Sequence, residues 1–183
     1  MTLEIGVSKI EKKFFEMEKQ LDIVLSESRK TVRGCSNTIK ALHSHDFKVA
    51  KTHLTEAEAG LEKIMPHYIN FPDQINHALQ EYTEAKIVFV AIEEKRIIKF
   101  DELNVPEVPY LNGLLDSVGE LKREMYEALR KGDRKLAEEY FALMEAIYDE
   151  LLPIRFSNAI LPEFRRKQDV ARIQIEQARG ELL

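Results

Sequence analysis

The chain has 183 residues, of which 44% are hydrophobic and 32% are charged, a globular balance that excludes a disordered chain. Its length suits one domain over residues 1–183 with a sizeable buried core. The net charge of -5 excludes a protein that binds nucleic acid through overall positive charge, although it leaves room for local basic patches.

Cys35 is the single cysteine, which excludes an intrachain disulfide framework and a thiolate zinc site within one chain. A reducing compartment suits such a chain. The N-terminus has no apolar run long enough for a signal peptide, and no later segment approaches a transmembrane span. We therefore expect a soluble cytoplasmic protein with no membrane partner.

Helical periodicity dominates the chain, and helix breakers are few, with 7 glycines and 6 prolines. From Ile10 to Leu42 the apolar residues recur at spacings of three and four, which predicts a long first helix over residues 8–43. Cys35 falls on this apolar stripe and is expected to be an inert packed thiol. Asp46 is a good N-cap for a second helix.

The second helix is expected to end at Met65, because Pro66 follows it. The third should begin at Pro72, and its segment 87–92 is apolar all round, which indicates burial on several sides. No strand pattern of any length appears. The later helices are expected over residues 72–98, 110–131, 133–151 and 163–179. These elements predict an all-α fold, an antiparallel bundle of about six to seven helices.

Two carboxylate pairs stand at helical spacing, Glu81 with Glu84 and Asp116 with Glu120. Side chains three or four residues apart project from one helix face. Each pair borders an apolar stripe, so it lies near the packed side of its helix. If the four carboxylates meet, they repel one another unless cations or protons neutralise them. A divalent metal site is the functional interpretation, and solvated acids on glutamate-rich amphipathic helices are the structural alternative.

The histidine pattern limits the choice of metal. Di-iron bundles require Glu-x-x-His on two helices, and none of the 5 histidines has a glutamate three residues before it. A site made of oxygen ligands favours hard ions such as Mg²⁺, Mn²⁺ or Ca²⁺. We expect Mg²⁺, with Mn²⁺ as a substitute. Because Mg²⁺ held by carboxylates usually takes phosphate as a further ligand, a phosphodiester is the expected substrate.

Basic residues form a second pattern. Three of them on the first helix fall within about 40° on a helical wheel, and two continue the pattern on the second helix. Such a row suits a groove that follows phosphates, while a solvated face is the structural alternative. The expected nucleic-acid-binding residues are Arg29, Arg33, Lys40, Lys48 and Lys51. A further basic cluster starts the last helix at 165–167. His43 could contact phosphate or bases, but histidines at helix ends are usually surface residues.

Several strings, taken in order, resemble the translin family and specifically its translin-associated factor X branch. They are LQEYTEA at residues 79–85, PYLNGLLDSVGELKRE at 109–124, KGD at 131–133 and RRKQDVARIQIEQARGEL at 165–182. The short segment between the third and fourth helices is similar to that of a compact prokaryotic or archaeal-type member.

The resemblance implies an α-helical protomer that assembles into closed, hollow octamers and binds single-stranded RNA or DNA. For the factor X branch it also implies a metal-dependent endoribonuclease whose acidic residues lie inside the shell. Carried over by position, those acids are Glu81, Glu84, Asp116 and Glu120.

We therefore expect an Mg²⁺-dependent endoribonuclease acting on single-stranded RNA, with DNA as an open second substrate. Glu81, Glu84 and Asp116 would hold one or two metal ions, and Glu120 would be a further ligand or a base. Two alternatives stay open: a non-catalytic translin-like protein that binds single-stranded RNA or DNA, and a helical scaffold with no nucleic-acid role.

Helix length predicts self-association. A first helix of about 36 residues is about 54 Å long at 1.5 Å per residue, and the shorter helices that follow cannot cover it. Phe15 and the poorly periodic segment 151–161 provide further apolar surface. We expect an obligate homo-oligomer, the octamer that the resemblance implies, with the acidic sites facing an internal cavity.

Overall fold

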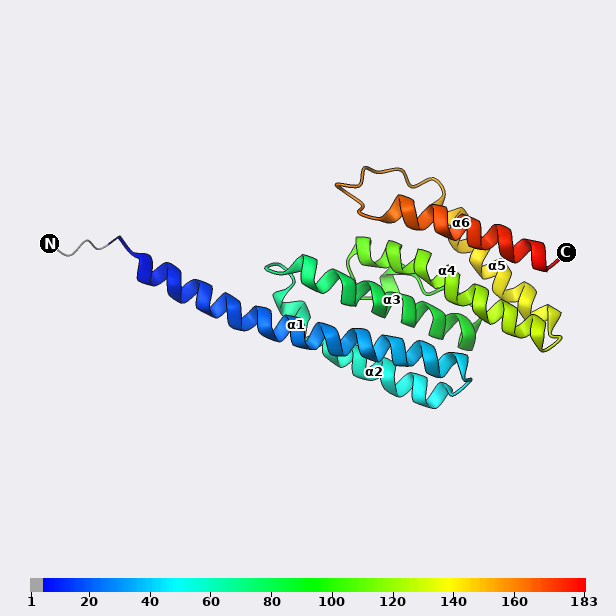
Figure 1. The fold of residues 1–183 in the computed structure, drawn as a ribbon, viewed down its shortest axis with the longest axis horizontal. Helices are drawn as coiled ribbons and strands as arrows, with labels where there is room; N and C mark the ends of the chain where they lie inside the picture. The colour runs from blue at the N-terminus through cyan, green and yellow to red at the C-terminus, as the bar shows by residue number, and fades with distance from the viewer. Residues whose placement is uncertain (1–4) are drawn as a thin grey trace.

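The computed structural model describes residues 5–183, which form an all-α fold (Figure 1). The helices are α1 (Val7–His43), α2 (Phe47–Ile64), α3 (Pro72–Glu94), α4 (Glu107–Arg130), α5 (Arg134–Leu151) and α6 (Phe164–Glu181). Two short 3₁₀ turns, Met65–His67 and Phe100–Glu102, lie between them. No strand occurs within the described residues. The predicted fold class and the predicted number of helices are confirmed.

Local signals set several helix ends. The Asp46 carboxylate accepts a hydrogen bond from the Val49 amide at 3.1 Å and so caps α2. Asp133 caps α5 in the same way through the Leu136 amide at 3.0 Å. Gly132, with φ of 77°, provides the left-handed turn between α4 and α5. These ends follow from capping chemistry within a few residues, which explains why they were predictable.

The prediction that the third helix continues through Ile98 is wrong. Lys95 adopts a left-handed conformation with φ of 54°, which ends α3 at Glu94. Beyond this point Ile98 is buried, and its carbonyl accepts a hydrogen bond from the Tyr110 hydroxyl at 2.9 Å. A tertiary contact with α4 therefore replaces the helical hydrogen bond that the apolar pattern suggested.

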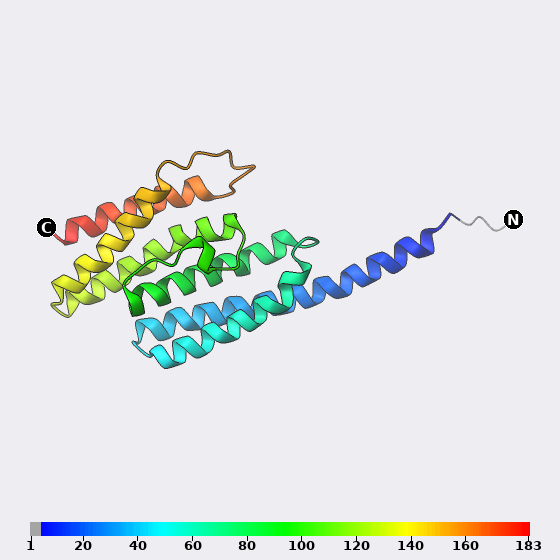
Figure 2. The same ribbon diagram turned by 180° about the vertical axis from the view of Figure 1, so that it is seen from behind.

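The helices stack in layers, with the α1–α2 hairpin on one side, α3 and α4 in the middle, and α5 and α6 on the other side (Figure 1). Neighbours along the chain run in opposite directions, with the exception of α3 and α4. These two run the same way, because the linker 95–106 passes back along the bundle (Figure 2). This arrangement brings the carboxylates of α3 level with those of α4.

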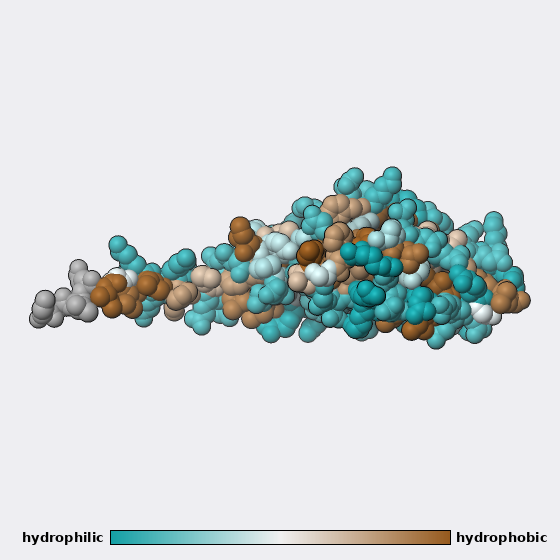
Figure 3. Space-filling model, turned by 90° about the horizontal axis from the view of Figure 1, so that it is seen from above, coloured by the Kyte–Doolittle hydropathy of each residue, from teal (hydrophilic) through white to brown (hydrophobic). Residues whose placement is uncertain are grey.

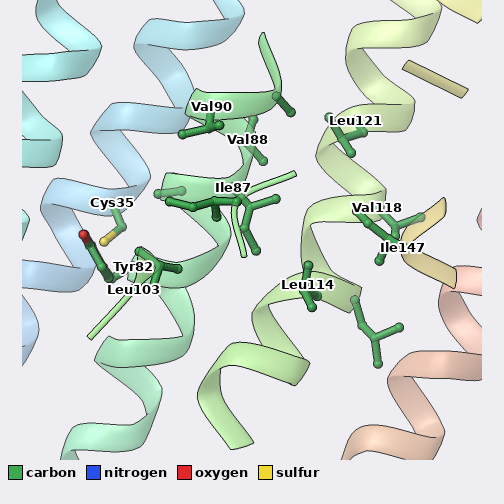
Figure 4. Close-up of a cluster of buried hydrophobic side chains, with 14 of the residues drawn as sticks. Cys35, Tyr82, Ile87, Val88, Val90, Leu103, Leu114, Val118, Leu121 and Ile147 are labelled. Carbon is green, nitrogen blue, oxygen red and sulfur yellow. The ribbon is translucent and has the colours of Figure 1, made fainter. Parts of the chain in front are cut away.

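The core draws buried side chains from all six helices, and Figure 4 shows a part of it that includes residues of α1, α3, α4 and α5. Val88 of α3 and Val118 of α4 are fully buried, and Cys35 of α1 is 1% exposed. Burial, together with the nearby charges of Glu81 and Glu84, raises the pKa of the Cys35 thiol to about 12. The prediction of a packed thiol is therefore confirmed, and its inertness stays a prediction.

The first turns of α1 extend beyond the other helices (Figure 1). Ile10, Phe14 and Phe15 are 53%, 62% and 57% exposed, and this part of the surface carries hydrophobic patches (Figure 3). The later helices leave it uncovered, as the length argument predicts. None of the helices in residues 5–183 combines the length and the apolar character needed to cross a membrane.

The segment 151–161 divides into core and surface. Leu151 and Leu161 are core residues, at 4% and 5% exposed, whereas Phe156 and Ile160 are more than 60% exposed. Phe156 and Ile160, together with Leu152 at 42% exposed, remain candidates for contact with another chain.

Candidate functional site

All four predicted acids line one pocket of about 500 Å³ between α3, α4 and α6, called here the acidic pocket. Helix α3 supplies Glu81 and Glu84, and helix α4 supplies Asp116 and Glu120. Each side chain is partly buried. The tertiary structure thus gathers into one site two pairs that the sequence could place only on separate helices.

Gly113 allows the two central helices to approach closely beside this pocket. A Cβ atom at position 113 would lie 2.7 Å from the Thr83 Cβ and 3.0 Å from the Gln80 carbonyl oxygen. The Gln80 amide in turn donates a hydrogen bond to the Asp116 carboxylate at 2.8 Å. The glycine and this hydrogen bond set the position of Asp116 relative to α3.

The pKa of Glu84 reflects the excess negative charge in the pocket. Burial raises its pKa, and the carboxylates of Asp116, Glu81 and Glu120 raise it further, to about 8. The nearby Lys167 opposes this shift but does not cancel it. Near neutral pH the Glu84 carboxyl therefore holds a proton for most of the time, and a cation entering the pocket competes with that proton.

Two cationic side chains already contact the acids. The Lys167 ammonium lies 2.5 and 2.7 Å from the two Asp116 carboxylate oxygens. The two ring nitrogens of His43 lie 2.6 Å from Glu120 and 2.6 Å from Glu124. Each contact joins helices that are distant in the chain.

The His43 side chain is largely buried, which contradicts the expectation of a surface residue. Its side chain is 7% exposed, because α1 lies against α3 in the bundle. Burial lowers its pKa, but the hydrogen bonds to Glu120 and Glu124 outweigh this effect and raise the pKa to about 9. His43 is therefore an imidazolium ion at neutral pH. Glu124 was not among the predicted site residues, although its position four residues after Glu120 places it on the same helix face.

A second pocket of about 510 Å³, called here the side pocket, lies between α1, α3 and α4. It shares Glu81, Glu84 and Glu120 with the acidic pocket. Lys40 and Arg123 line it on the side of α1 and α4. Across the acids, Arg166 and Lys167 line the acidic pocket from α6. Cationic side chains therefore flank the acids on two sides.

Of the predicted nucleic-acid-binding residues, only Lys40 lines one of these pockets. Lys40 lines the side pocket, and Arg29 and Arg33 are exposed on the same face of α1 by helical spacing. Lys48 and Lys51 are exposed on α2 and line neither pocket. The basic row on α1 thus leads toward the acids, while the two lysines of α2 stand apart.

The donor chemistry of the acidic pocket fits a hard divalent cation, since carboxylate oxygens are the ligands that Mg²⁺ and Mn²⁺ take. In the described part of the chain, however, no three His, Cys, Asp or Glu side chains are arranged to hold a metal ion. Asp116 and Glu120 direct oxygens toward Lys167 and His43 instead. Metal binding therefore requires these carboxylates to exchange partners.

Comparison with known proteins decides the family, because residues 6–178 match the Translin family. The chain belongs to the translin family. An uncharacterised protein of Methanocaldococcus jannaschii is 30% identical over an alignment of 164 residues, which covers 87% of this chain and 73% of the relative. The resemblance inferred from the sequence is therefore confirmed for the family, and the factor X branch stays a prediction.

Solved structures of C3PO proteins share this fold. The complex of AfC3PO with duplex RNA is 29% identical with a TM-score of 0.90, over 97% of this chain and 95% of that chain. AfC3PO in a second structure is 30% identical with a TM-score of 0.87 and the same coverage. Apo-NeC3PO, at 24% identity and a TM-score of 0.89 over 100% and 98% of the two chains, supports the fold alone.

Proposed function

We propose that this translin-family protein binds RNA and cleaves it as an Mg²⁺-dependent endoribonuclease at the acidic pocket. The observation that carries the proposal is the meeting of four carboxylates from two helices in one pocket, where charge repulsion raises the pKa of Glu84 to about 8. The similarity to AfC3PO, which was solved with duplex RNA, supports RNA as the ligand.

Glu81, Glu84 and Asp116 are the proposed ligands of Mg²⁺ or Mn²⁺, with Glu120 as a further ligand or a base. When bound, the metal would activate water and stabilise negative charge on the phosphate. The protein itself supplies orientation: Gln80 holds Asp116, and His43 holds Glu120.

Cationic side chains offer positions for phosphates next to the cleaved bond. Lys40 and Arg123 line the side pocket, and Arg166 lines the acidic pocket. A strand that crosses the shared acids can place one phosphate near each group. This arrangement explains how a chain with a net charge of -5 can bind RNA.

The alternative is a non-catalytic RNA-binding protein, and one observation favours it. Asp116 is already paired with Lys167, so part of the acidic charge is neutralised without a metal. The motifs predict single-stranded RNA or DNA as the ligand, whereas the AfC3PO complex contains duplex RNA. Both forms therefore belong in the test.

We further propose that the protein belongs to the factor X branch and works as a closed homo-oligomer, an octamer, with the acidic pockets facing an internal cavity. The uncovered apolar surface of α1 supports self-association.

The test measures cleavage of end-labelled RNA, single-stranded and duplex, and of single-stranded DNA, with Mg²⁺, Mn²⁺ or EDTA. We expect metal-dependent cleavage that falls at least about a hundredfold in Glu84→Gln. Glu93→Gln is the matched control, because Glu93 is exposed on the same helix outside both pockets. Cleavage in EDTA, or full activity of Glu84→Gln, would overturn the nuclease; RNA binding without cleavage in any metal would favour the alternative.

A further inference from the structure

Lys167 is a largely buried lysine that contacts both carboxylate oxygens of one of the four acids. Its ammonium engages both oxygens of Asp116, at 2.5 and 2.7 Å, and its side chain is only 14% exposed. The neighbouring Arg166 also lines the pocket but pairs with Glu163 on its own helix, and its side chain is 66% exposed. Of these two cations, Lys167 alone is bound to one of the four acids.

Helix α6 does not by itself favour a lysine at position 167. Lys167 lies at the fourth residue of α6, close to the end where the helix dipole disfavours positive charge. Asp116 on α4 compensates for this, so the ion pair depends on the packing of α4 against α6. The lysine is therefore held in place by the acidic pocket.

Both Asp116 oxygens already have a donor, since Gln80 binds Oδ2 and Lys167 contacts both oxygens. A metal ion that uses Asp116 must take at least one of these oxygens. Lys167 is the donor that carries charge, and two cations repel each other at that distance. The ammonium therefore disfavours a metal ion beside Asp116 for as long as Lys167 keeps both of its contacts.

We propose that Lys167 is the resident counter-cation of the acidic pocket and that a divalent metal must displace its ammonium from Asp116 in order to bind. Lys167 is then a positioning residue that holds Asp116 in the metal-free protein. Its charge weakens the binding of a divalent metal to the pocket. The inference rests on the proposed metal site and adds the regulation of that site.

The charge balance of the pocket supports the exchange. Lys167 pairs with Asp116 and His43 pairs with Glu120, so of the four acids Glu81 and Glu84 are bound to neither of these two cations. The pocket therefore retains negative charge that a divalent ion satisfies better than a single lysine does. The structural alternative is that Lys167 simply ties α6 to α4, in which case its removal would destabilise the protein without strengthening metal binding.

The experiment measures Mn²⁺ binding to the full-length protein by calorimetry and by electron paramagnetic resonance. Lys167→Met keeps the aliphatic chain and removes the charge, and Arg166→Met is the matched control in the same pocket. We expect the Mn²⁺ dissociation constant of Lys167→Met to be about tenfold lower than that of the unmodified protein, about 1.4 kcal/mol. For Arg166→Met we expect a change of less than about threefold, because screening weakens an exposed charge.

Thermal unfolding gives a second measure. Lys167→Met should unfold at a lower temperature in EDTA, and Mn²⁺ should raise its midpoint more than it raises that of the unmodified protein. The inference is overturned if the Mn²⁺ dissociation constant of Lys167→Met equals or exceeds that of the unmodified protein. It is also overturned if Arg166→Met strengthens Mn²⁺ binding as much as Lys167→Met does, because that result indicates a general charge effect. If the unmodified protein binds no divalent metal, the proposed function fails first.

A measurement on the unmodified chain covers the case in which Lys167→Met does not fold. Mass spectrometry would follow acylation of the Lys167 amine in Mg²⁺ and in EDTA, with the exposed Lys48 as the internal reference. We expect faster acylation of Lys167 in Mg²⁺, because the displaced amine is no longer paired. Equal rates in the two conditions would refute the displacement.

Discussion

Glu84 links the stability of the protein to the chemistry of the pocket. Its pKa of about 8 in the folded chain lies above the model-compound value of 4.5. Between these two values the folded protein binds a proton that the unfolded chain has released. The Glu84 contribution to stability therefore falls as pH rises through this window.

The first prediction concerns Glu84→Gln, which removes the ionisation and keeps the shape. We expect the variant to unfold at a higher temperature than the unmodified protein at pH 8.5 in EDTA, with the difference vanishing near pH 4.5. Melting curves between pH 4.5 and 9 test this, and Glu93→Gln should follow the unmodified protein. A lower midpoint for Glu84→Gln at pH 8.5 would count against charge repulsion as the cause. The same variant is expected to be inactive, so stability and activity trade off at this residue.

His43 provides the second prediction at this scale. Replacement by alanine leaves the Glu124 carboxylate, which is 2% exposed, without its partner, so we expect a loss of about 3 kcal/mol in the free energy of unfolding. The pKa of His43 is raised to about 9, so its contribution is full below about pH 6.5 and is lost as pH rises through 9.

Urea unfolding at pH 6.5 and pH 9.5 measures this effect, and the gap between the two proteins should narrow at the higher pH. His53→Ala is the control, since His53 pairs with Glu56 at the surface of α2 and should cost less than about 1 kcal/mol. A gap that is constant with pH would show that His43 acts through packing alone.

At the scale of elements, the contact between α3 and α4 positions the site. The third prediction is that Gly113→Ala destabilises the protein by about 1–3 kcal/mol, because the new Cβ meets Thr83 at 2.7 Å. Separating the helices should also reduce metal-dependent cleavage, because Asp116 would move relative to Glu81. Chemical denaturation and the cleavage assay measure the two effects.

Gly180→Ala is the matched control for this prediction. Gly180 also lies within a helix, but nothing stands within 4 Å of the position of its Cβ. Alanine there should be neutral or should stabilise the protein by up to about 1 kcal/mol. Equal effects of the two substitutions would show that helix propensity, and not close packing, explains Gly113.

For the whole molecule, the overhanging part of α1 is the feature that bears on assembly. The fourth prediction is that the protein self-associates, so that light scattering at micromolar concentration gives a mass several times the 21.3 kDa of one chain. Phe14→Glu should lower that mass, because Phe14 is 62% exposed on the overhang. Ile69→Glu is the control, since Ile69 is 87% exposed in the turn before α3. A stable monomer of the unmodified chain would refute the prediction.

The sequence by itself determined the helices and most of their ends, because helical periodicity and capping act over a few residues. It also determined that Glu81 and Glu84 share a face, and that Asp116 and Glu120 share another, because spacing on one helix is a local property. The uncovered stripe of α1 followed from helix length alone. The family resemblance, carried by ordered motifs, pointed to the same four acids.

Only the tertiary structure decided which faces meet and what each acid contacts. The parallel course of α3 and α4 depends on how a linker packs, and no local signal encodes that. The partners of Asp116 and Glu120 are Lys167 and His43, which lie 51 and 77 residues away in the chain. The proton on Glu84 likewise depends on burial and on charges from another helix. Long-range electrostatics arises from packing, so it enters only when the bundle is assembled.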